Sequence, residues 1–153
     1  MLTFATKRVT IHTYNNSMGD VFMTFNHGAQ TITTYPGKKT IKSAAVGATT
    51  VEEVNWLIDK LISLSAPWKN SGWAYIVEIS KMSPASPEVS EVLVTLHKRL
   101  ADAGCKVMAF VNFASFITGA QAKEHQKKSN TGIVENTFRT EEEAMKWIET
   151  VLK

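Results

Sequence analysis

The chain has 153 residues, 44% of them hydrophobic and 20% charged, and its formal net charge of +3 is mild. This composition fits one folded domain, and it lacks the concentrated basic surface of a typical nucleic-acid-binding protein. No apolar run approaches the roughly 20 residues needed to cross a bilayer, and residues 1–7 lack a signal-peptide pattern. We therefore expect a soluble cytoplasmic protein with neither membrane insertion nor a nucleic-acid partner.

The first third of the chain has the pattern of β-strands with one buried face. Four segments alternate apolar and polar residues. They are Val9–Tyr14, Val21–Phe25, Thr31–Tyr35 and Thr40–Val46. The turn-rich stretch Asn15–Gly19 joins the first two, and Pro36–Gly37 joins the second two, so we expect two antiparallel pairs.

After Gly47 the hydrophobic period changes from 2 to 3.6, which predicts helices. Each predicted helix follows a side chain that can cap its N-terminus. These caps are Thr50, Ser86 (followed by Pro87), Ser115 and Thr140. Pro67 ends the first helix, Gly104 is placed to end the second, and the third reaches about Lys128. Strands are expected between the helices at Trp73–Ile79, Lys106–Phe113 and Ile133–Phe138.

This order predicts an α/β fold with a mixed, mostly parallel central sheet and an N-terminal β-hairpin arm. Strands that alternate with helices pair in parallel through crossovers. The strand at Lys106–Phe113 is apolar on both faces, so helices should cover both sides of the sheet. We expect one domain, with residues 1–29 as the arm and residues 30–153 as the core.

Catalytic motifs are absent from the sequence, so we expect no enzyme, no cofactor and no metal. The glycines form no phosphate-binding loop, and the four histidines lie on different elements. His97 is expected to be partly buried with a hydrogen-bonded ring, and Cys105 to be a small buried residue. The acidic run Glu141–Glu143 suits the first turn of a helix. Glu78 lies in an apolar strand, so it is either exposed or paired at the strand end, or a buried carboxylate with a raised pKa.

Two loops at the carboxyl ends of the predicted parallel strands form a candidate binding surface, since ligands of open α/β sheets bind there. Their candidate residues are Lys81, Met82, Ser83, Ser86, Asn112, Phe113 and Ser115. Helices begin at both loops, and their free N–H groups favour an anion or a carboxylate. The alternative is that Ser86 and Ser115 serve only as caps. Met82 and Phe113 are unusual for loop residues that merely face solvent.

Trp56 is a second candidate for a contact surface. Counting 100° per residue places it almost opposite the apolar stripe of its helix, among polar side chains. Tryptophan is enriched at interfaces, so Trp56 could contact another chain. The alternative is that another segment, such as the N-terminal arm, covers it.

The order of elements resembles the STAS or SpoIIAA-like domain, the fold of anti-sigma-factor antagonists and of sulphate-transporter tails. Its pattern of sizes and periods is matched over about residues 31–153. The matching segments are Gly47–Thr50, Val77–Ser80, Leu93–Gly104, Lys106–Asn112 and Phe138–Ile148. The resemblance implies a mixed α/β sheet in a protein that acts on a partner. It is stronger to stand-alone bacterial proteins of this fold, for which it implies no general function.

One departure from that family limits what the resemblance implies. Antagonists carry Asp-Ser-Ser/Thr-Gly after the strand, with a hydroxyl that a kinase phosphorylates. Here the stretch is Ser83–Val89, without that motif. Ser86 lies near the place, but Pro87 follows it and Glu88 adds fixed charge. The phosphoswitch is therefore not carried over, and phosphorylation of Ser83 or Ser86 stays open.

Two functions follow from these observations. The first is a non-enzymatic regulatory or protein-interaction module that binds an unknown partner protein or a second copy of itself as a homodimer. The alternative is a binder of a small apolar or anionic molecule, such as a lipid-like molecule, a nucleotide or a carboxylate. An enzyme is disfavoured because no nucleophile–base pair or metal-ligand set is visible.

Overall fold

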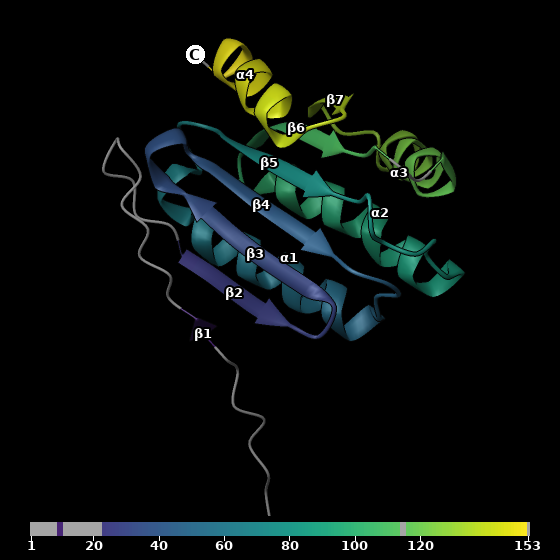
Figure 1. Cartoon of the computed structure of the whole chain (residues 1–153). Coiled ribbons are helices and arrows are strands. Elements are labelled where there is room, and N and C mark those ends of the chain that lie inside the picture. The colour runs from purple at the N-terminus through teal and green to yellow at the C-terminus, as the bar shows by residue number, and fades with distance from the viewer. Residues whose placement is uncertain (1–8, 11–22, 114–115, 153) are drawn as a thin grey trace, which may run out of the picture.

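The computed structural model describes residues 9–10, 23–113 and 116–152, which form a seven-stranded sheet with helices on both faces (Figure 1). The strands are β1 Val9–Thr10, β2 Met23–His27, β3 Gln30–Tyr35, β4 Thr40–Ala45, β5 Trp73–Glu78, β6 Cys105–Val111 and β7 Val134–Phe138. The helices are α1 Val51–Ser65, α2 Pro87–Asp102, α3 Phe116–Ser129 and α4 Glu141–Val151, with short 3₁₀ turns η1 Pro36–Lys38 and η2 Ala66–Trp68.

The strands lie in the sheet in the order in which they occur along the chain. Neighbours from β1 to β4 pair antiparallel, and neighbours from β4 to β7 pair parallel. The predicted mixed, mostly parallel α/β fold is therefore confirmed. Val9 pairs with Phe25, but the turn expected at Asn15–Gly19 lies outside the described residues. The division of the chain at residue 29 stays a prediction.

Helices cover the two faces of the sheet unequally (Figure 1). Helices α1 and α2 lie on one face, where Tyr75 and Met108 join the larger apolar cluster. Helix α4 lies on the other face, where Ile76 and Val107 join a smaller cluster with Ile148. The prediction that β6 is a central strand with helices on both sides is confirmed, since successive side chains of a strand point to opposite faces.

Three of the four predicted N-caps are present. Thr50 accepts a hydrogen bond from the backbone N–H of Glu53 at 3.1 Å, and Ser86 and Thr140 accept from Val89 and Glu143 at 3.2 Å. These bonds satisfy N–H groups that the first helical turn leaves free. Ser115 lies outside the described residues.

Gly104 ends the α2 segment where the sequence places it. Its φ of +92° is left-handed, and a Cβ there would lie 2.3 Å from the carbonyl oxygen of Lys69. Only glycine fits both demands. The residue therefore turns the chain directly from α2 into β6.

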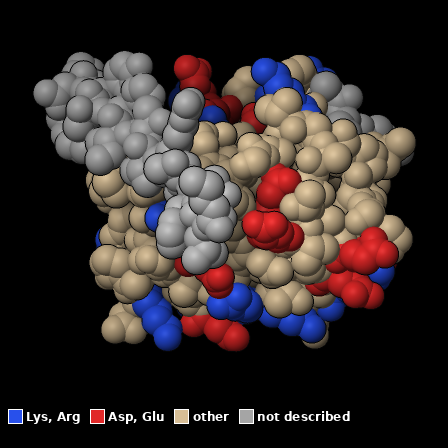
Figure 2. All heavy atoms as spheres, turned by 90° about the horizontal axis from the view of Figure 1, so that it is seen from below, with Lys and Arg blue, Asp and Glu red and all other residues tan. Residues whose placement is uncertain are grey.

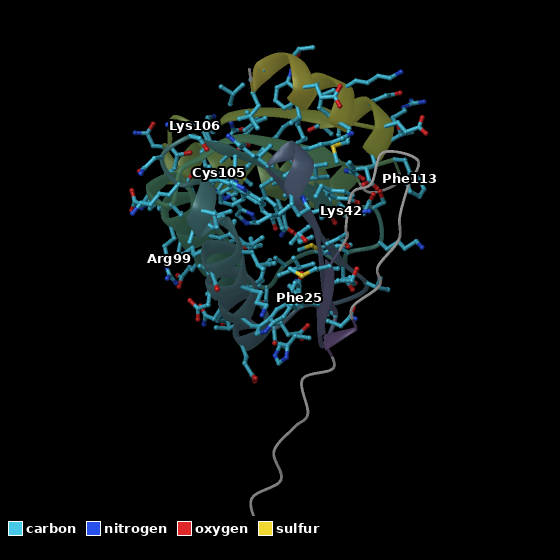
Figure 3. The ribbon with its side chains drawn as sticks, turned by 90° about the vertical axis from the view of Figure 1, so that its left-hand side faces the viewer. Phe25, Lys42, Arg99, Cys105, Lys106 and Phe113 are labelled. Carbon is cyan, nitrogen blue, oxygen red and sulfur yellow. The ribbon has the colours of Figure 1, made fainter. Side chains whose placement is uncertain are left out.

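Two ion pairs join neighbouring elements, one within the α1–α2 layer and one between the sheet and α4. Lys42 points away from the α1–α2 layer, whereas Arg99 lies on the outside of that layer (Figure 3). Arg99 pairs with Asp59 at 3.3 Å, which links α2 to α1. Lys42 pairs with Glu141 at 2.8 Å, which links β4 to α4.

Candidate functional site

The two loops predicted to form a binding surface lie together at the carboxyl edge of the parallel strands. The backbone N–H of Phe113 donates to the Ser80 hydroxyl at 3.3 Å. The hydroxyl of Thr118, in the first turns of α3, donates to the carbonyl of Met82 at 3.2 Å. Gln121 donates to the carbonyl of Ala85 and accepts from its N–H, at 3.2 and 2.8 Å. Helix α3 thus fixes the loop that precedes α2.

A third loop, which the sequence analysis missed, completes this edge. The N–H of Gly47 donates to the carbonyl of Lys81, and the N–H of Ser83 donates to the carbonyl of Gly47, both at 2.9 Å. The segment after β4 therefore pairs with the segment after β5. The signal was present in the sequence, since β4 is also a parallel strand whose carboxyl end reaches this edge.

Apolar side chains stand exposed along this edge. Among the described residues, the three most exposed large apolar side chains are Phe113 at 67%, Val46 at 65% and Ile117 at 61%. Phe113 lies at the outer border of the packed side chains in Figure 3. Lys81 is exposed beside them, and Met82 is half-buried against the core. We call Val46, Lys81, Met82, Phe113 and Ile117 the edge surface.

The remaining loop candidates have structural contacts. Ser86 is exposed, and its hydroxyl accepts the capping bond from Val89. Ser83 and Asn112 are half-buried, and the N–H of Asn112 donates to the carbonyl of Phe138 at 2.9 Å. Ser115 lies outside the described residues. Of the seven loop candidates, Lys81, Met82 and Phe113 belong to the edge surface.

Trp56 has a neighbour within its own chain. Its ring stacks on His27, with 5.0 Å between the ring centroids and 29° between the planes. His27 ends β2, so the N-terminal arm partly covers Trp56, which was one of the two alternatives from the sequence. Trp56 is half-buried and packs against the larger apolar cluster.

A small cavity lies behind the edge surface, between the sheet and helices α1, α2 and α3. Its volume is about 50 Å³ and its walls are mostly carbon. Polar side chains also reach it, among them Ser43 and Tyr75 from the sheet, His97 from α2 and His125 from α3. Both hydroxyls and both imidazoles are buried. The buried residues of α3 are polar, namely Thr118, His125 and Ser129, which is unusual for the inner face of a helix.

His97 is buried with a hydrogen-bonded ring, as predicted. Its Nδ1 donates to the carbonyl of Leu93 at 2.9 Å, so that nitrogen carries a hydrogen. Its Nε2 lies 3.3 Å from Oε1 of Glu135 on β7, and both side chains are 4% exposed. The distance is that of a close polar pair, but the two groups are not aligned for a hydrogen bond. Nothing in the sequence pattern indicates that Glu135 lies beside His97.

Burial also governs the titration of two other groups. Burial, together with the neighbouring His97 ring, lowers the pKa of His125 to about 4. Burial raises the pKa of the Cys105 thiol to about 12, so this thiol is not activated as a nucleophile. The carboxylate of Glu78 accepts from the N–H of Ser80 at 2.8 Å, so it is paired at the strand end.

The described residues offer neither a cluster of metal ligands nor a membrane-spanning helix. No group of three or more His, Cys, Asp or Glu side chains there could hold a metal ion. No helix there is long and apolar enough to span a bilayer. On the face seen from below, acidic and basic side chains are interspersed (Figure 2).

Comparison with solved structures gives the relationship of this fold to known ones. One match is a crystal structure of an uncharacterized protein of the DUF3478 family with a SpoIIAA-like fold, from Shewanella loihica PV-4. It has a TM-score of 0.58 and 15% sequence identity, over 85% of this chain and 94% of that one. The chain has the SpoIIAA-like fold. The resemblance expected from the sequence is thereby confirmed at the level of the fold.

A second match to the SpoIIAA-like fold is the anti-sigma factor antagonist SpoIIAA in its unphosphorylated form. It has a TM-score of 0.50 and 14% identity, over 87% of this chain and the whole of that one. No family model and no curated protein matches the sequence. Since both identities are low, the likeness establishes the fold and leaves the function to the residues of this chain.

Proposed function

We propose that this protein is a non-enzymatic regulatory module that binds a partner protein through the edge surface. The observation that supports this most is that Val46, Phe113 and Ile117, the three most exposed large apolar side chains of the described residues, all lie in segments at the carboxyl edge of the parallel strands. Single exposed apolar residues are ordinary on proteins, whereas several at one edge favour an interaction site.

The edge surface has the composition of an interface core. Apolar and aromatic side chains dominate the centre of protein interfaces, and charged ones are depleted there. Phe113 can serve as an aromatic anchor, and half-buried Met82 can adapt to the partner's shape. Lys81 is the charged member of the edge surface. A membrane surface would favour a cluster of basic residues instead, so a protein partner fits this edge better.

The backbone of this edge is well fixed. The bonds of Gly47 with Lys81 and Ser83, and of Thr118 with Met82, hold three separate segments together. A surface that is ordered before binding loses less conformational entropy when it binds. The fold neighbour SpoIIAA is an anti-sigma factor antagonist, which supports a protein as the partner here.

The partner can be found and tested with a photo-crosslinking residue in place of Phe113, in cells that carry the protein. The control places the same residue at Val134, which is 50% exposed at the start of β7, away from the carboxyl edge. The partner protein that crosslinks to Phe113 is then identified and purified. Its affinity is measured for the variants Phe113→Ser, Ile117→Ser and Val134→Ser. We expect the two edge variants to weaken binding by about 10-fold or more each, and Val134→Ser by less than about twofold.

Three outcomes would contradict this proposal. Equal affinity for the edge variants and Val134→Ser would remove the edge surface from the interface. Crosslinking of Phe113 only to a second copy of the chain would identify a homodimer instead. Sedimentation of the protein with anionic vesicles, lost in the edge variants, would identify a lipid surface as the target.

A further inference from the structure

The cavity behind the edge surface has a hydrogen-bond donor that lacks an acceptor. The hydroxyls of Ser43 and Tyr75 bond to each other, and both side chains are at most 2% exposed. Each hydroxyl has one hydrogen, so the hydroxyl that accepts keeps its own. Neither makes another hydrogen bond within the described residues. A buried donor without an acceptor is costly, by about 1–3 kcal/mol.

A second polar side chain beside this cavity can also form a hydrogen bond with an occupant. His125 is 6% exposed, and its ring has no hydrogen-bond partner within the described residues. His125 and Gln121 line both the cavity and a groove on the surface between α2 and α3. These two side chains therefore form the wall between the cavity and solvent. Helix α3 packs on α2, at one end of the sheet (Figure 1). The α3 side of this wall is therefore held in place by α2 and not by close packing against a strand.

The surroundings disfavour a charged occupant. The walls are mostly carbon, where an ion is poorly solvated. Burial is the largest cause of the lowered pKa of His125, in keeping with poor solvation of a charged group beside this cavity. The carboxylate of Glu135 contacts His97 on the cavity wall and would repel an anion. Positive charge from Lys128 and negative charge from Glu124 reach His125 along α3.

We propose that this cavity binds a small neutral molecule that has an apolar body and one carbonyl or hydroxyl oxygen. The oxygen accepts the free hydrogen of the Ser43–Tyr75 pair, and the apolar body contacts Met108 and Leu96. A cavity of about 50 Å³ is several times the 10–15 Å³ that one water needs, so it admits a short molecule. Met82 lines this cavity and also belongs to the edge surface, but the proposed contacts with Ser43, Tyr75, Met108 and Leu96 do not involve the exposed residues of that surface.

The test uses 2-butanone as the probe and butyrate as its charged counterpart of equal carbon number. The full chain is labelled with ¹³C at methionine and leucine methyl groups and titrated by NMR. We expect 2-butanone to shift the methyl signals of Met108 and Leu96 along a saturable curve. Butyrate at the same concentrations should give no saturable shift. Shifts that grow linearly, or that spread over the surface, would show a solvent effect only and overturn the proposal, as would equal binding of butyrate.

Two variants locate the site. Ala122→Met, on the cavity wall, should fill the space and abolish saturable binding, whereas Ala120→Met, exposed on the same helix, should leave it unchanged. The double variant Ser43→Ala/Tyr75→Phe removes the donor and should weaken 2-butanone binding at least about fivefold. Unchanged binding in either the filled cavity or the double variant would overturn the proposal. Edge variants such as Phe113→Ser should bind the probe normally, so the two proposals fail independently.

Discussion

The phenol of Tyr35 on β3 donates a 2.7 Å hydrogen bond to the carboxylate of Glu141, the first residue of α4. Lys42 on β4 donates to the same carboxylate at 2.8 Å. One acidic side chain thus joins two strands to the helix on the second face of the sheet. The acidic first turn of α4 suits the helix dipole, and Glu141 adds tertiary contacts to that role.

Replacing Glu141 with Gln should lower stability by about 1 kcal/mol, since the pair with Lys42 is partly exposed and its charge is lost. Burial alone would raise the pKa of Glu141, but the hydrogen bonds from Lys42 and Tyr35 outweigh it and lower that pKa. The stabilisation is therefore complete above the ordinary value of 4.5 and is lost as the pH falls through the lowered pKa.

Urea unfolding at pH 7 and at acidic pH measures this effect. The matched control is Glu142→Gln, an exposed neighbour in the same helical turn. Wild type should lose more stability than Glu141→Gln as the pH falls below 4.5. If the two Gln variants had equal stability at pH 7, Glu141 would make no net contribution through Tyr35 and Lys42.

His125 should make the protein sensitive to mild acid. Its folded-state pKa of about 4 lies below the ordinary 6.5, so the unfolded chain binds its proton more readily. The contribution is complete above about pH 6.5 and is lost as the pH falls toward 4. Allowing for partial access to solvent, we expect a loss of about 1–2 kcal/mol from this residue.

Thermal unfolding between pH 7 and pH 4.5 tests the acid effect, with His125→Gln as the variant and His27→Gln as the control. His125→Gln should show a smaller fall in Tm than wild type, whereas His27→Gln should follow wild type. A wild-type fall in Tm that His125→Gln leaves unchanged would assign the acid sensitivity to other groups.

Local signals in the sequence predicted most of the fold. Ser86 with Pro87 marked the start of α2, and Gly104 marked its end, because capping depends on residues close in the chain. The apolar centre of Lys106–Phe113, on both faces of the predicted strand, marked β6 as central, although the strand itself spans Cys105–Val111. These features need no knowledge of distant contacts.

Contacts between distant segments escaped prediction. Tyr35 and Glu141 are 106 residues apart, and neither residue type indicates the other. Helical periodicity placed Trp56 on a polar face, but it could not show that His27 stacks on it. The polar inner face of α3, with His125, gives no apolar stripe, so neither the burial of His125 nor the cavity was foreseen.

The turn between β2 and β3 depends on Gly28. Its φ is +57°, and a Cβ there would lie 2.6 Å from the Glu53 carboxylate, which accepts the N–H of Ala29 at 2.6 Å. Gly28→Ala should therefore destabilise the protein by about 1–3 kcal/mol, through backbone strain and displacement of that carboxylate. Gly132→Ala is the control, since nothing lies within 4 Å of its added Cβ. Equal unfolding midpoints in urea for the two variants would show that this turn tolerates a side chain.

The Cys105 thiol should be inert in the folded protein. It is 3% exposed, and burial raises its pKa to about 12, so almost no thiolate is present at neutral pH. Cys105 is the only cysteine of the chain, so reaction with a chromogenic disulfide reagent reports on it alone. We expect one equivalent of the coloured thiol product to be released per chain in guanidinium chloride. In buffer the reaction should be at least about 100-fold slower, because it requires opening of the fold. Cys105→Ser, which removes the thiol, gives the baseline. Rapid reaction of the folded protein would show that the amino end of β6 opens far more readily than its burial beside Trp73 indicates.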